Sequence, residues 1–257
     1  MKNIKMISID LDGTLLKSDK TICEKSLNSI YSLKEKGIIV VFNTGRPFKL
    51  IPKELLSRND YFILSNGTYC INDNQKMFDN QIAYFDSKNI INYFSNKYED
   101  IFFSIESGDN IYSCHKDHSK CKLYYAEKIK KEHLVEKDIR KFLIINEKDN
   151  YIDIKDLEKN IPKDTKILIT EKGKYIQIMP FFSSKLTGIE FLCEKHGIDL
   201  DNVLAFGDDF NDFEAIKEVG IGVAMANADI EIKKIADYIA LSNDNNGIHH
   251  FIQKHFL

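Results

Sequence analysis

Short apolar runs alternate with longer amphipathic segments along the chain. Four of the apolar runs are residues 4–9, 38–42, 61–64 and 203–206, and each ends at a polar group of residues. Short, continuously apolar runs are typical of strands that are buried on both faces of a parallel sheet. Residues 24–36 are charged with one apolar face, and Gly37 follows, so we predict an amphipathic helix there. Strand, helix and strand in this order predict a βαβ unit.

The pattern changes in the middle of the chain. Residues 82–180 are charged and rich in tyrosine and phenylalanine, and no polar motif follows their apolar runs. Two alternating segments, residues 166–170 and 175–179, flank the polar residues 171–174, which predicts a β-hairpin. This part of the chain is therefore predicted to form a mixed α+β module.

The first pattern returns after Pro180. A helix is predicted over residues 185–196, and further short strands follow it. We therefore expect an α/β core with a doubly wound parallel sheet, built from residues 1–81 and 182–257. Residues 82–181 would be the inserted domain.

Composition and charge limit which binding partners and which cellular compartment we expect for this chain. The formal net charge of the 257-residue chain is −3, from 36 basic and 39 acidic residues. This balance lacks the excess of positive charge that is typical of proteins that bind nucleic acid or an anionic membrane, so neither partner is expected. No apolar run reaches the ~18 residues of a membrane span, and no signal peptide is recognised at the N-terminus. Five scattered cysteines do not suggest a disulfide framework, and we expect a reducing cytoplasm.

Polar side chains gather where the predicted strands end. They are Asp10, Asp12, Thr44, Asp208, Asn211 and Asp212, with Lys185 at the start of a predicted helix. In open α/β sheets, ligands bind outside the carboxyl ends of the strands. Carboxylates suit Mg²⁺, and a carboxylate can also attack phosphorus. If the chain stayed extended, Asp10 and Asp12 would point the same way, so that one could attack while the other carries a proton. A lysine and a hydroxyl can hold phosphoryl oxygens.

These residues form a set of motifs in a known order. Asp10-Leu11-Asp12-Gly13-Thr14-Leu15 resembles the first motif of the haloacid dehalogenase superfamily. The second, third and fourth motifs resemble Asn43-Thr44-Gly45-Arg46, Lys185 and Gly207-Asp208-Asp209-Phe210-Asn211-Asp212. Residues 223–228, 236–237 and 242–247 resemble the end of the Cof-type sugar-phosphatase branch. The resemblance implies a Rossmann-like core, and the inserted domain resembles that branch's large cap in position and length.

The resemblance also implies an activity. It is a Mg²⁺-dependent phosphoric monoester hydrolase that acts on small organic phosphates, such as sugar phosphates, through an aspartyl-phosphate. Asp10 would be the nucleophile and a metal ligand. Asp12 would be the general acid and base, with its backbone carbonyl on the metal, and Asp208 would be the other protein ligand. The motifs carry no information on the oligomeric state.

The remaining motif residues would hold the substrate and its surroundings. By resemblance, Thr44 and Lys185 would hold phosphate oxygens, and Asn211 would contact the phosphate or a water on the metal. Asp212 would orient Lys185 or such a water. Gly45 and Arg46 would lie on the substrate side, although Arg46 could equally neutralise nearby carboxylates. We expect Asp209 to be solvated and Asn66-Gly67 to shape a turn.

Other functions use similar residues. A phosphomutase or phosphotransferase on the same fold would keep Asp10 and pass the phosphoryl group to a sugar hydroxyl. A signalling receiver domain also uses Asp, Mg²⁺, Thr and Lys, but receivers are single short domains. A non-catalytic binding protein would not need the full set of catalytic residue types. The joint occurrence of the motifs, in order and at strand ends, favours the phosphatase.

One cluster in the inserted domain has a different chemistry. Cys114, His115, His118 and Cys121 are residue types that could ligate Zn²⁺. Cys114 and His115 are adjacent, which is not a usual zinc spacing. We therefore interpret this segment as a polar loop, with a metal site as the alternative.

Overall fold

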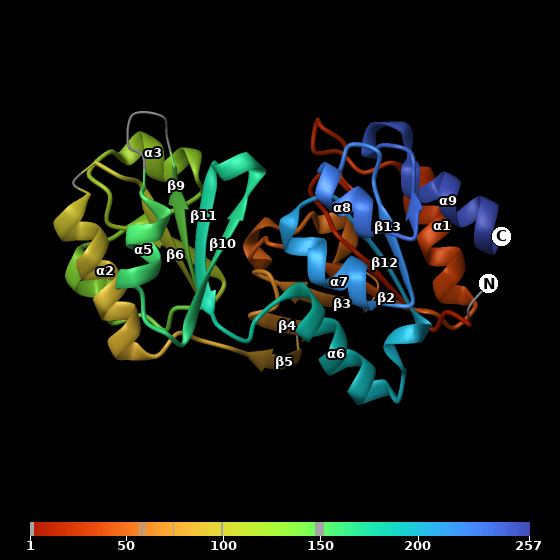
Figure 1. Cartoon of the computed structure of the whole chain (residues 1–257), viewed down its shortest axis with the longest axis horizontal. Helices are drawn as coiled ribbons and strands as arrows, with labels where there is room; N and C mark the ends of the chain where they lie inside the picture. The colour runs from red at the N-terminus through yellow and green to blue at the C-terminus, as the bar shows by residue number, and fades with distance from the viewer. Residues whose placement is uncertain (1–2, 57, 59, 74, 99, 147–151) are drawn as a thin grey trace. The chain divides into compact units, whose positions relative to one another are not determined.

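The structure, a computed structural model, describes residues 3–56, 58, 60–73, 75–98, 100–146 and 152–257. The chain forms two compact units (Figure 1). The first comprises Met1–Gly45, Pro52–Phe78 and Ser184–Leu257, and the second comprises Arg46–Ile51 and Asp79–Ser183. The junctions therefore lie at 78/79 and 183/184, where the sequence suggested 81/82 and 181/182. A short segment, Arg46–Ile51, groups with the second unit.

The described part of the first unit is built on one sheet with the strand order β14-β13-β12-β1-β2-β3-β4-β5. Its strands are β1 Met6–Ile9, β2 Ile39–Asn43, β3 Tyr61–Leu64, β4 Tyr69–Asn72, β5 Gln75–Asp79, β12 Val203–Gly207, β13 Ile221–Ala224 and β14 Tyr238–Ile239. All pairs from β14 to β3 are parallel, and β4 pairs antiparallel with β3. The predicted α/β class with a doubly wound parallel sheet is confirmed.

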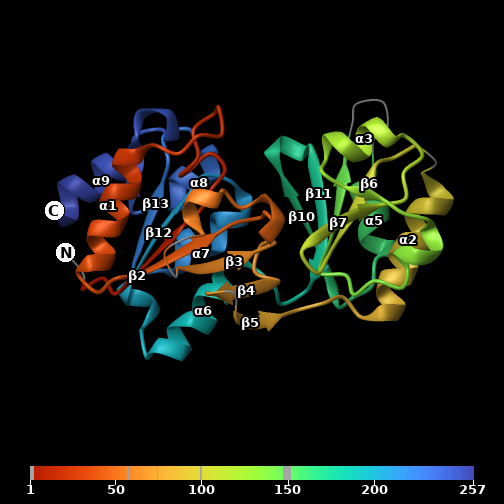
Figure 2. The same cartoon turned by 180° about the vertical axis from the view of Figure 1, so that it is seen from behind.

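Helices cover both faces of this sheet (Figures 1 and 2). They are α1 Glu24–Glu35, α6 Lys185–His196, α7 Phe213–Glu218, α8 Ile230–Ile235 and α9 Gly247–Phe256, with 3₁₀ turns at Lys53–Leu55, Leu200–Asn202, Phe210–Asp212 and Asn243–Asn245. A further 3₁₀ turn, Phe48–Leu50, belongs to the second unit. Ile189 and Leu192 of α6 pack with Val41 in one buried cluster. On the other face, the ring of Phe251 from α9 meets Phe206 edge-on at 5.3 Å. The apolar strands are thus buried on both sides, as their sequence indicated.

The second unit contains a separate sheet with the order β10-β11-β9-β6-β7-β8 in its described part. Its strands are β6 Phe103–Ser107, β7 Asn110–Ser113, β8 Glu127–Lys128, β9 Lys141–Ile145, β10 Thr165–Thr170 and β11 Tyr175–Pro180. Its helices are α2 Tyr84–Lys97, α3 His118–Leu123, α4 Lys131–Leu134 and α5 Ile154–Asn160, with a 3₁₀ turn at Glu171–Gly173. The predicted hairpin is present as β10 and β11, and Lys172 adopts a positive φ of 55° in its turn.

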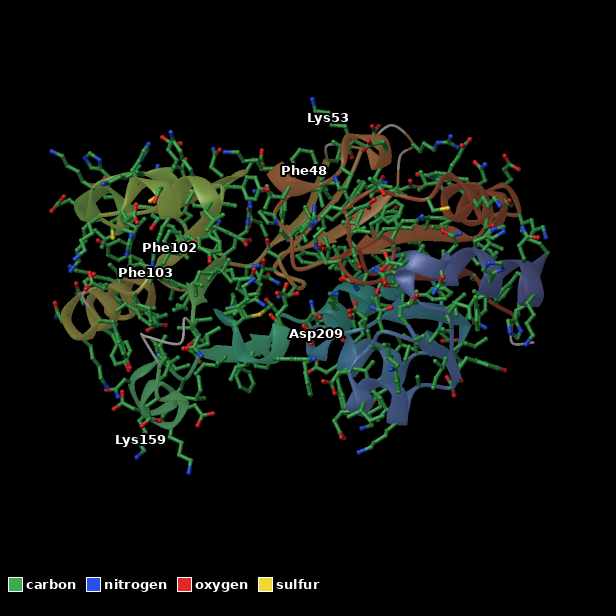
Figure 3. All side chains as sticks on the ribbon, turned by 90° about the horizontal axis from the view of Figure 1, so that it is seen from above. Phe48, Lys53, Phe102, Phe103, Lys159 and Asp209 are labelled. Atoms are coloured by element: carbon green, nitrogen blue, oxygen red, sulfur yellow. The ribbon has the colours of Figure 1, made fainter. Side chains whose placement is uncertain are left out.

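The first residue of β6 and the residue just before it belong to different clusters, because successive side chains of an extended chain point to opposite sides. Phe103 packs with Phe94 of α2 and Leu157 of α5 in the main core of the second unit. Its neighbour Phe102 packs instead with Cys121 and Tyr124 (both phenylalanines are labelled in Figure 3).

Among the described residues, no helix is both long enough and apolar enough to cross a membrane.

Candidate active site

Two aspartates follow neighbouring strands at the carboxyl edge of the sheet in the first unit. β1 and β12 are parallel neighbours, with Ile9 paired to Phe206. Asp10 follows β1 directly, and Asp208 follows β12 directly. The backbone N–H of Asp10 donates to the carbonyl of Phe206 at 3.1 Å, which extends the pairing by one residue. The strand order therefore sets the two aspartates side by side at the carboxyl edge, where such sheets bind ligands.

Lys185 links two carboxylates at this edge. It begins α6, after a capping box formed by Ser184 and Thr187. The lysine Nζ donates to Oδ1 of Asp10 at 2.5 Å and to Oδ1 of Asp212 at 2.6 Å, and its side chain is only 1% exposed. Burial alone would lower the pKa of Lys185, but the two carboxylates outweigh it and raise the pKa. The lysine is therefore a permanent buried cation.

Three carboxylates converge here. Asp10, Asp208 and Asp212 can each offer an oxygen within 4.8 Å of the others, and they are the one such group of metal-ligand side chains in the described part of the chain. Burial raises the pKa of Asp10 well above its usual range, with Lys185 opposing this shift. Burial, followed by the charge of Asp212, raises the pKa of Asp208 to about 7. An oxygen-only set of desolvated, mutually repelling carboxylates fits Mg²⁺, a hard divalent cation.

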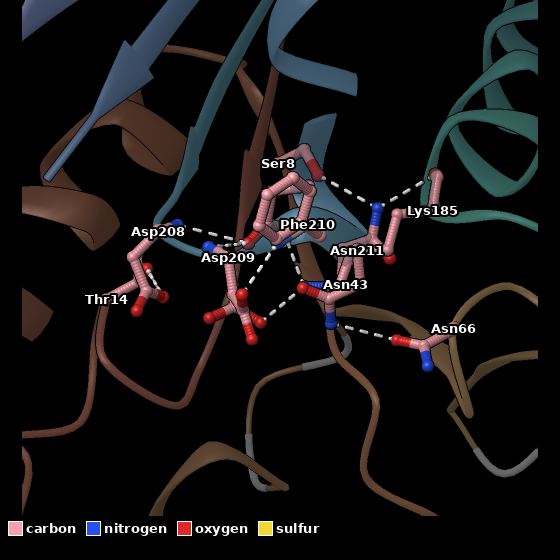
Figure 4. A network of polar contacts seen from close by, with 11 residues as sticks. Ser8, Thr14, Asn43, Asn66, Lys185, Asp208, Asp209, Phe210 and Asn211 are labelled. Atoms are coloured by element: carbon pink, nitrogen blue, oxygen red, sulfur yellow. Dashed lines mark hydrogen bonds and ion pairs between the residues drawn. The ribbon is translucent and has the colours of Figure 1, made fainter. Parts of the chain in front are cut away.

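The loops that carry these carboxylates are locked to one another (Figure 4). The Thr14 hydroxyl donates to Oδ1 of Asp208 at 2.9 Å. Oδ2 of Asp212 accepts the backbone N–H groups of Asp208 and Asp209 at 3.1 and 3.3 Å. A Cβ on Gly13 would stand 2.2 Å from Asp208 Oδ2, so this position has no room for a side chain. Asp208 is therefore fixed through its carboxylate by Thr14 and through its backbone N–H by Asp212.

Asp12 lies outside this group of carboxylates. The chain turns directly after Asp10, because the N–H of Leu15 donates back to the Asp10 carbonyl at 3.2 Å. The chain is therefore not extended after Asp10, which was the condition for the side chains of Asp10 and Asp12 to point the same way. The Asp12 carboxylate is instead 38% exposed and pairs with the Nζ of Lys20 at 2.7 Å.

The second and fourth motifs meet at a third loop. Thr44 follows β2, is 1% exposed, and its N–H donates to the carbonyl of Ile63 at 2.8 Å. The side-chain amide of Asn211 donates to Oδ1 of Asn66 at 3.0 Å (Figure 4). A Cβ on Gly45 would lie 2.9 Å from that same oxygen, which leaves little space for another residue. Thr44, Gly45, Asn66 and Asn211 therefore belong to one polar region of the first unit.

Arg46 belongs to the second unit. Its guanidinium donates to the carbonyl of Leu50 at 2.8 Å. The contact of Arg46 with substrate stays a prediction, as do the individual roles of the other motif residues.

A family model for haloacid dehalogenase-like hydrolases matches residues 7–252. The chain belongs to this family. A 5-amino-6-(5-phospho-D-ribitylamino)uracil phosphatase of Bacillus subtilis is 28% identical over 256 residues, which cover 96% of this chain and 93% of that protein. A phosphoglycolate phosphatase of Methanobrevibacter smithii is 25% identical over 261 residues, covering 99% and 100%. The family match and the phosphatase names confirm the predicted enzyme class, a phosphatase of the haloacid dehalogenase type.

Solved structures of the family share the fold. A subclass IIB sugar phosphatase superposes with a TM-score of 0.86 at 23% identity, covering 97% of this chain and 98% of that one. A protein of Thermotoga maritima gives 0.84 at 23% identity, covering 99% and 98%. These structures show that the fold is shared, and the assignment to the Cof-type branch stays a prediction.

The Cof-type segments near the C-terminus hold the loop that follows Asp10. The Asn227 amide donates to the Gly13 carbonyl at 2.7 Å, and its Oδ1 accepts the N–H of Asn243 at 3.1 Å. The Asn243 amide donates to the Leu16 carbonyl at 2.9 Å. The resemblance of these segments to the Cof-type branch implied no role for them.

Further along the loop, Ser18 and Asp244 form a second pair of hydrogen bonds between the loop and the C-terminal segments. The N–H and hydroxyl of Ser18 donate to the two carboxylate oxygens of Asp244 at 2.8 and 2.7 Å. The C-terminal segments therefore fix the first motif through hydrogen bonds to its backbone, and no sequence signal specifies those partners.

Asn43 and Gly67, which the sequence placed in the second motif and in a turn, also position Lys185, a role that no residue pattern indicated. The buried Asn43 amide donates to the carbonyl of Lys185 at 2.9 Å and to the Ser8 hydroxyl at 3.3 Å (Figure 4). Gly67, at φ +85°, allows Ser184 to approach so closely that a Cβ would lie 1.9 Å from its carbonyl oxygen. Asn43 and Gly67 together seat the first residues of α6, and hence Lys185.

The cysteine and histidine cluster of the second unit does not form a group of metal ligands among the described residues. His115 Nδ1 accepts the N–H of Asp117 at 3.1 Å, and Nε2 lies 3.3 Å from the carbonyl of Asp100. Cys121 is fully buried. Both ring nitrogens of His115 are thus engaged by the backbone, and the structure supports the interpretation as a polar loop around α3.

Proposed function

We propose that this chain is a Mg²⁺-dependent phosphatase that hydrolyses small organic phosphate monoesters through an aspartyl-phosphate on Asp10. The observation that carries the proposal is the group of buried Asp10, partly buried Asp208 and buried Asp212, with Lys185 bonded to two of its members. A surface turn has no need of three desolvated carboxylates around one lysine. Such a cluster is stable when a divalent cation and a phosphate complete its charge balance.

Asp10, Asp208 and Asp212 would hold the metal, with the backbone carbonyl of Asp12. When bound, Mg²⁺ would neutralise phosphate charge and keep the carboxylates ionised at neutral pH. The three side chains provide oxygens only, which suits this cation.

The chain's own residues would divide the reaction between them. A carboxylate oxygen of Asp10 would attack phosphorus while Asp12 gives a proton to the departing oxygen. Asp12 would then take a proton from the water that attacks the phosphoaspartate. Lys185 and Thr44 would hold phosphoryl oxygens and stabilise their charge, and Asn211 would contact the phosphate.

The environments of the two aspartates support this division. Asp10 is buried beside a cation, whereas Asp12 is half-exposed and paired with a surface lysine. Carboxylates in different surroundings can serve as nucleophile and as proton carrier at one pH.

For substrate, we propose the small phosphate esters that the relatives' names describe, with sugar phosphates as the main class. The second unit would act as a cap that selects among them, with Arg46 at its boundary. We further propose that the enzyme works in the cytoplasm on a free metabolite, which agrees with its charge balance and unpaired cysteines.

Two substitutions test the mechanism. Asp10→Asn removes the attacking oxygen, so hydrolysis of an aryl phosphate should vanish and no phosphoenzyme should form. Asp12→Asn removes the proton carrier, so the rate should fall by about 10²–10⁴-fold. The loss should be smallest with an acidic phenol as leaving group, and phosphoenzyme should accumulate. Mass spectrometry of acid-quenched enzyme locates the phosphoryl group.

Asp209→Asn is the matched control. Asp209 caps the Phe210–Asp212 turn through the N–H of Phe210 at 2.9 Å, and asparagine caps equally well. This variant should keep its activity. An unchanged rate in Asp10→Asn would place the nucleophile elsewhere, and an isomerised sugar phosphate instead of free phosphate would identify a mutase.

A further inference from the structure

The second unit has a pocket that the proposed reaction does not use. Its volume is about 520 Å³, inside the range of ~300–1,000 Å³ that is usual for small-molecule sites. The end of α2, the start of β6, the segment after β7 and the stretch from β8 into α4 form its wall. All lining residues belong to the second unit, whereas the aspartate cluster belongs to the first.

One side of the pocket is strongly cationic. Lys116, Lys128, Lys130 and Lys131 line it, and no aspartate or glutamate of the described chain does. Lys116 pairs with Asp100, which is outside the lining. Lys128 donates to the backbone carbonyl of Lys116 at 2.7 Å, which holds its ammonium group in place. Such an excess of one sign of charge attracts a multiply charged anion.

The charge excess is not cancelled nearby. Within the described residues, Lys128, Lys130 and Lys131 make no ion pair with a carboxylate. Lys131 is partly buried, so its charge is less screened by water than that of an exposed lysine.

The floor of the pocket is apolar. Ile101 and Phe103 are 3% and 6% exposed, and Ile129 and Tyr98 pack against the main core of this unit. Ser95 lines the same pocket, and its buried hydroxyl has no hydrogen-bond partner in the described structure. Buried hydroxyls are rarely left unpaired, so Ser95 is a polar group without a partner at the edge of the apolar floor.

We propose that this pocket binds a small organic phosphate that carries two or more negative charges and an apolar or aromatic body. The phosphate would meet the lysine side, and the body would cover the apolar floor beside Phe103. The site depends on neither the metal nor Asp10, so it would be a second ligand site of the enzyme.

The test uses adenosine 5′-(β,γ-methylene)triphosphate, which joins an aromatic base to a polyanion. Titration calorimetry with the full-length protein in chelator keeps the first unit's carboxylates without metal, and these repel the probe. A built-in reporter gives the location, because the half-buried thiol of Cys114 lines the pocket, whereas the half-buried Cys23 lies in the first unit. The probe should slow alkylation of Cys114, followed by mass spectrometry, and leave Cys23 unchanged.

Charge reversal supplies matched variants. Lys130→Glu/Lys131→Glu turns two attractions into repulsions and should weaken binding about 30-fold. Lys155→Glu/Lys159→Glu makes the same change in charge on α5 of the same unit, away from the pocket (Lys159 is labelled in Figure 3). This control should change affinity less than about twofold. Circular dichroism checks that both variants are folded.

Three results would overturn the proposal. Equal affinity of the two double variants would show that the lysines do not bind the probe. Unchanged alkylation of Cys114 at saturation would place the probe elsewhere. Inorganic triphosphate binding as tightly as the full probe would show that the apolar floor contributes nothing. None of these results depends on hydrolysis, so they are separate from a failure of the proposed phosphatase.

Discussion

Replacing Lys185 by methionine should destabilise the protein, and the loss should grow as pH rises. Methionine keeps the length of the side chain and removes its charge. The lysine is 1% exposed and bonds to Asp10 at 2.5 Å and Asp212 at 2.6 Å, so its removal leaves buried carboxylates without their cation. Removing one partner of a buried ion pair costs about 3–5 kcal/mol.

A carboxylate that loses its cation can escape this cost by taking up a proton. Protonation costs about 1.4 kcal/mol for each unit by which the pH exceeds the unfolded pKa, for which the ordinary Asp value is 3.8. That amounts to about 5.7 kcal/mol at pH 8 and about 2.3 kcal/mol at pH 5.5. The loss in Lys185→Met should therefore be about 3–5 kcal/mol at pH 8 and at most about 2 kcal/mol at pH 5.5.

The sign of this pH dependence of stability follows from the direction of the pKa shifts. Burial raises the folded-state pKa values of Asp10 and Asp208, and without Lys185 both should rise further. A carboxyl with a raised folded pKa contributes its full stability below the unfolded pKa and loses it as pH rises towards the folded pKa. The stability curves of wild type and variant should thus meet near pH 4 and separate above it.

Calorimetry in chelator at pH 5.5 and 8 measures this difference, and separate unfolding of the two units would show as separate peaks. At about 2–4 °C per kcal/mol, Tm should fall by roughly 6–20 °C at pH 8 and by less than about 8 °C at pH 5.5. Lys195→Met, at an exposed position of the same helix, is the control and should change little. An equal loss at both pH values would refute the electrostatic account of Lys185.

Three other outcomes are expected. Because burial raises the pKa of Asp208 to about 7, Mg²⁺ must displace a proton from this carboxyl below that pH. The affinity for Mg²⁺, measured by calorimetry, should therefore rise up to about tenfold per pH unit between pH 6 and 7 and level off above pH 7. An affinity that does not change with pH would contradict this. Asn243→Ala removes a buried hydrogen bond to the loop after Asp10 and should lower kcat by roughly 10–100-fold with KM nearly unchanged in steady-state assays. Gly67→Ala should destabilise by at least about 2 kcal/mol in urea titrations, because its Cβ meets the Ser184 carbonyl, whereas Gly37→Ala, also at φ +85° but in open space, should cost less.

Elements with one dominant physical cause were predictable from sequence. The predicted strand over residues 38–42 differs from β2 by one residue at each end, and that over residues 203–206 differs from β12 by one residue at its C-terminal end. The agreement is close because buried parallel strands are continuously apolar. The helix predicted over residues 185–196 agrees with α6 at both ends. Gly197 follows it in the left-handed conformation at φ 62°, the usual reason for a glycine at that position.

Elements that depend on tertiary contacts were missed. β4 and β5 extend the core sheet beyond the predicted turn at Asn66-Gly67, although residues 69–72 carry no strong alternation. In the second unit, β8 has two residues and α4 has four, too short for any periodic signal. Such elements are stabilised by neighbours from distant parts of the chain, and a local pattern does not specify them.

The site itself shows what residue spacing leaves undetermined. The sequence pattern identified every carboxylate of the cluster and predicted that Asp212 orients Lys185 or a water on the metal, but it did not determine whether the chain stays extended between Asp10 and Asp12. Two hydrogen-bond patterns determine the arrangement: the Leu15 N–H turns the chain back to Asp10, and Asp212 both caps its own loop and accepts a hydrogen bond from Lys185, the contact that its predicted role requires. Asp10 is thereby desolvated beside a cation while Asp12 stays half-exposed, so two aspartates from one short motif occupy opposite environments. In the proposed mechanism that difference, which no spacing rule contains, would let one of them attack and the other carry the proton.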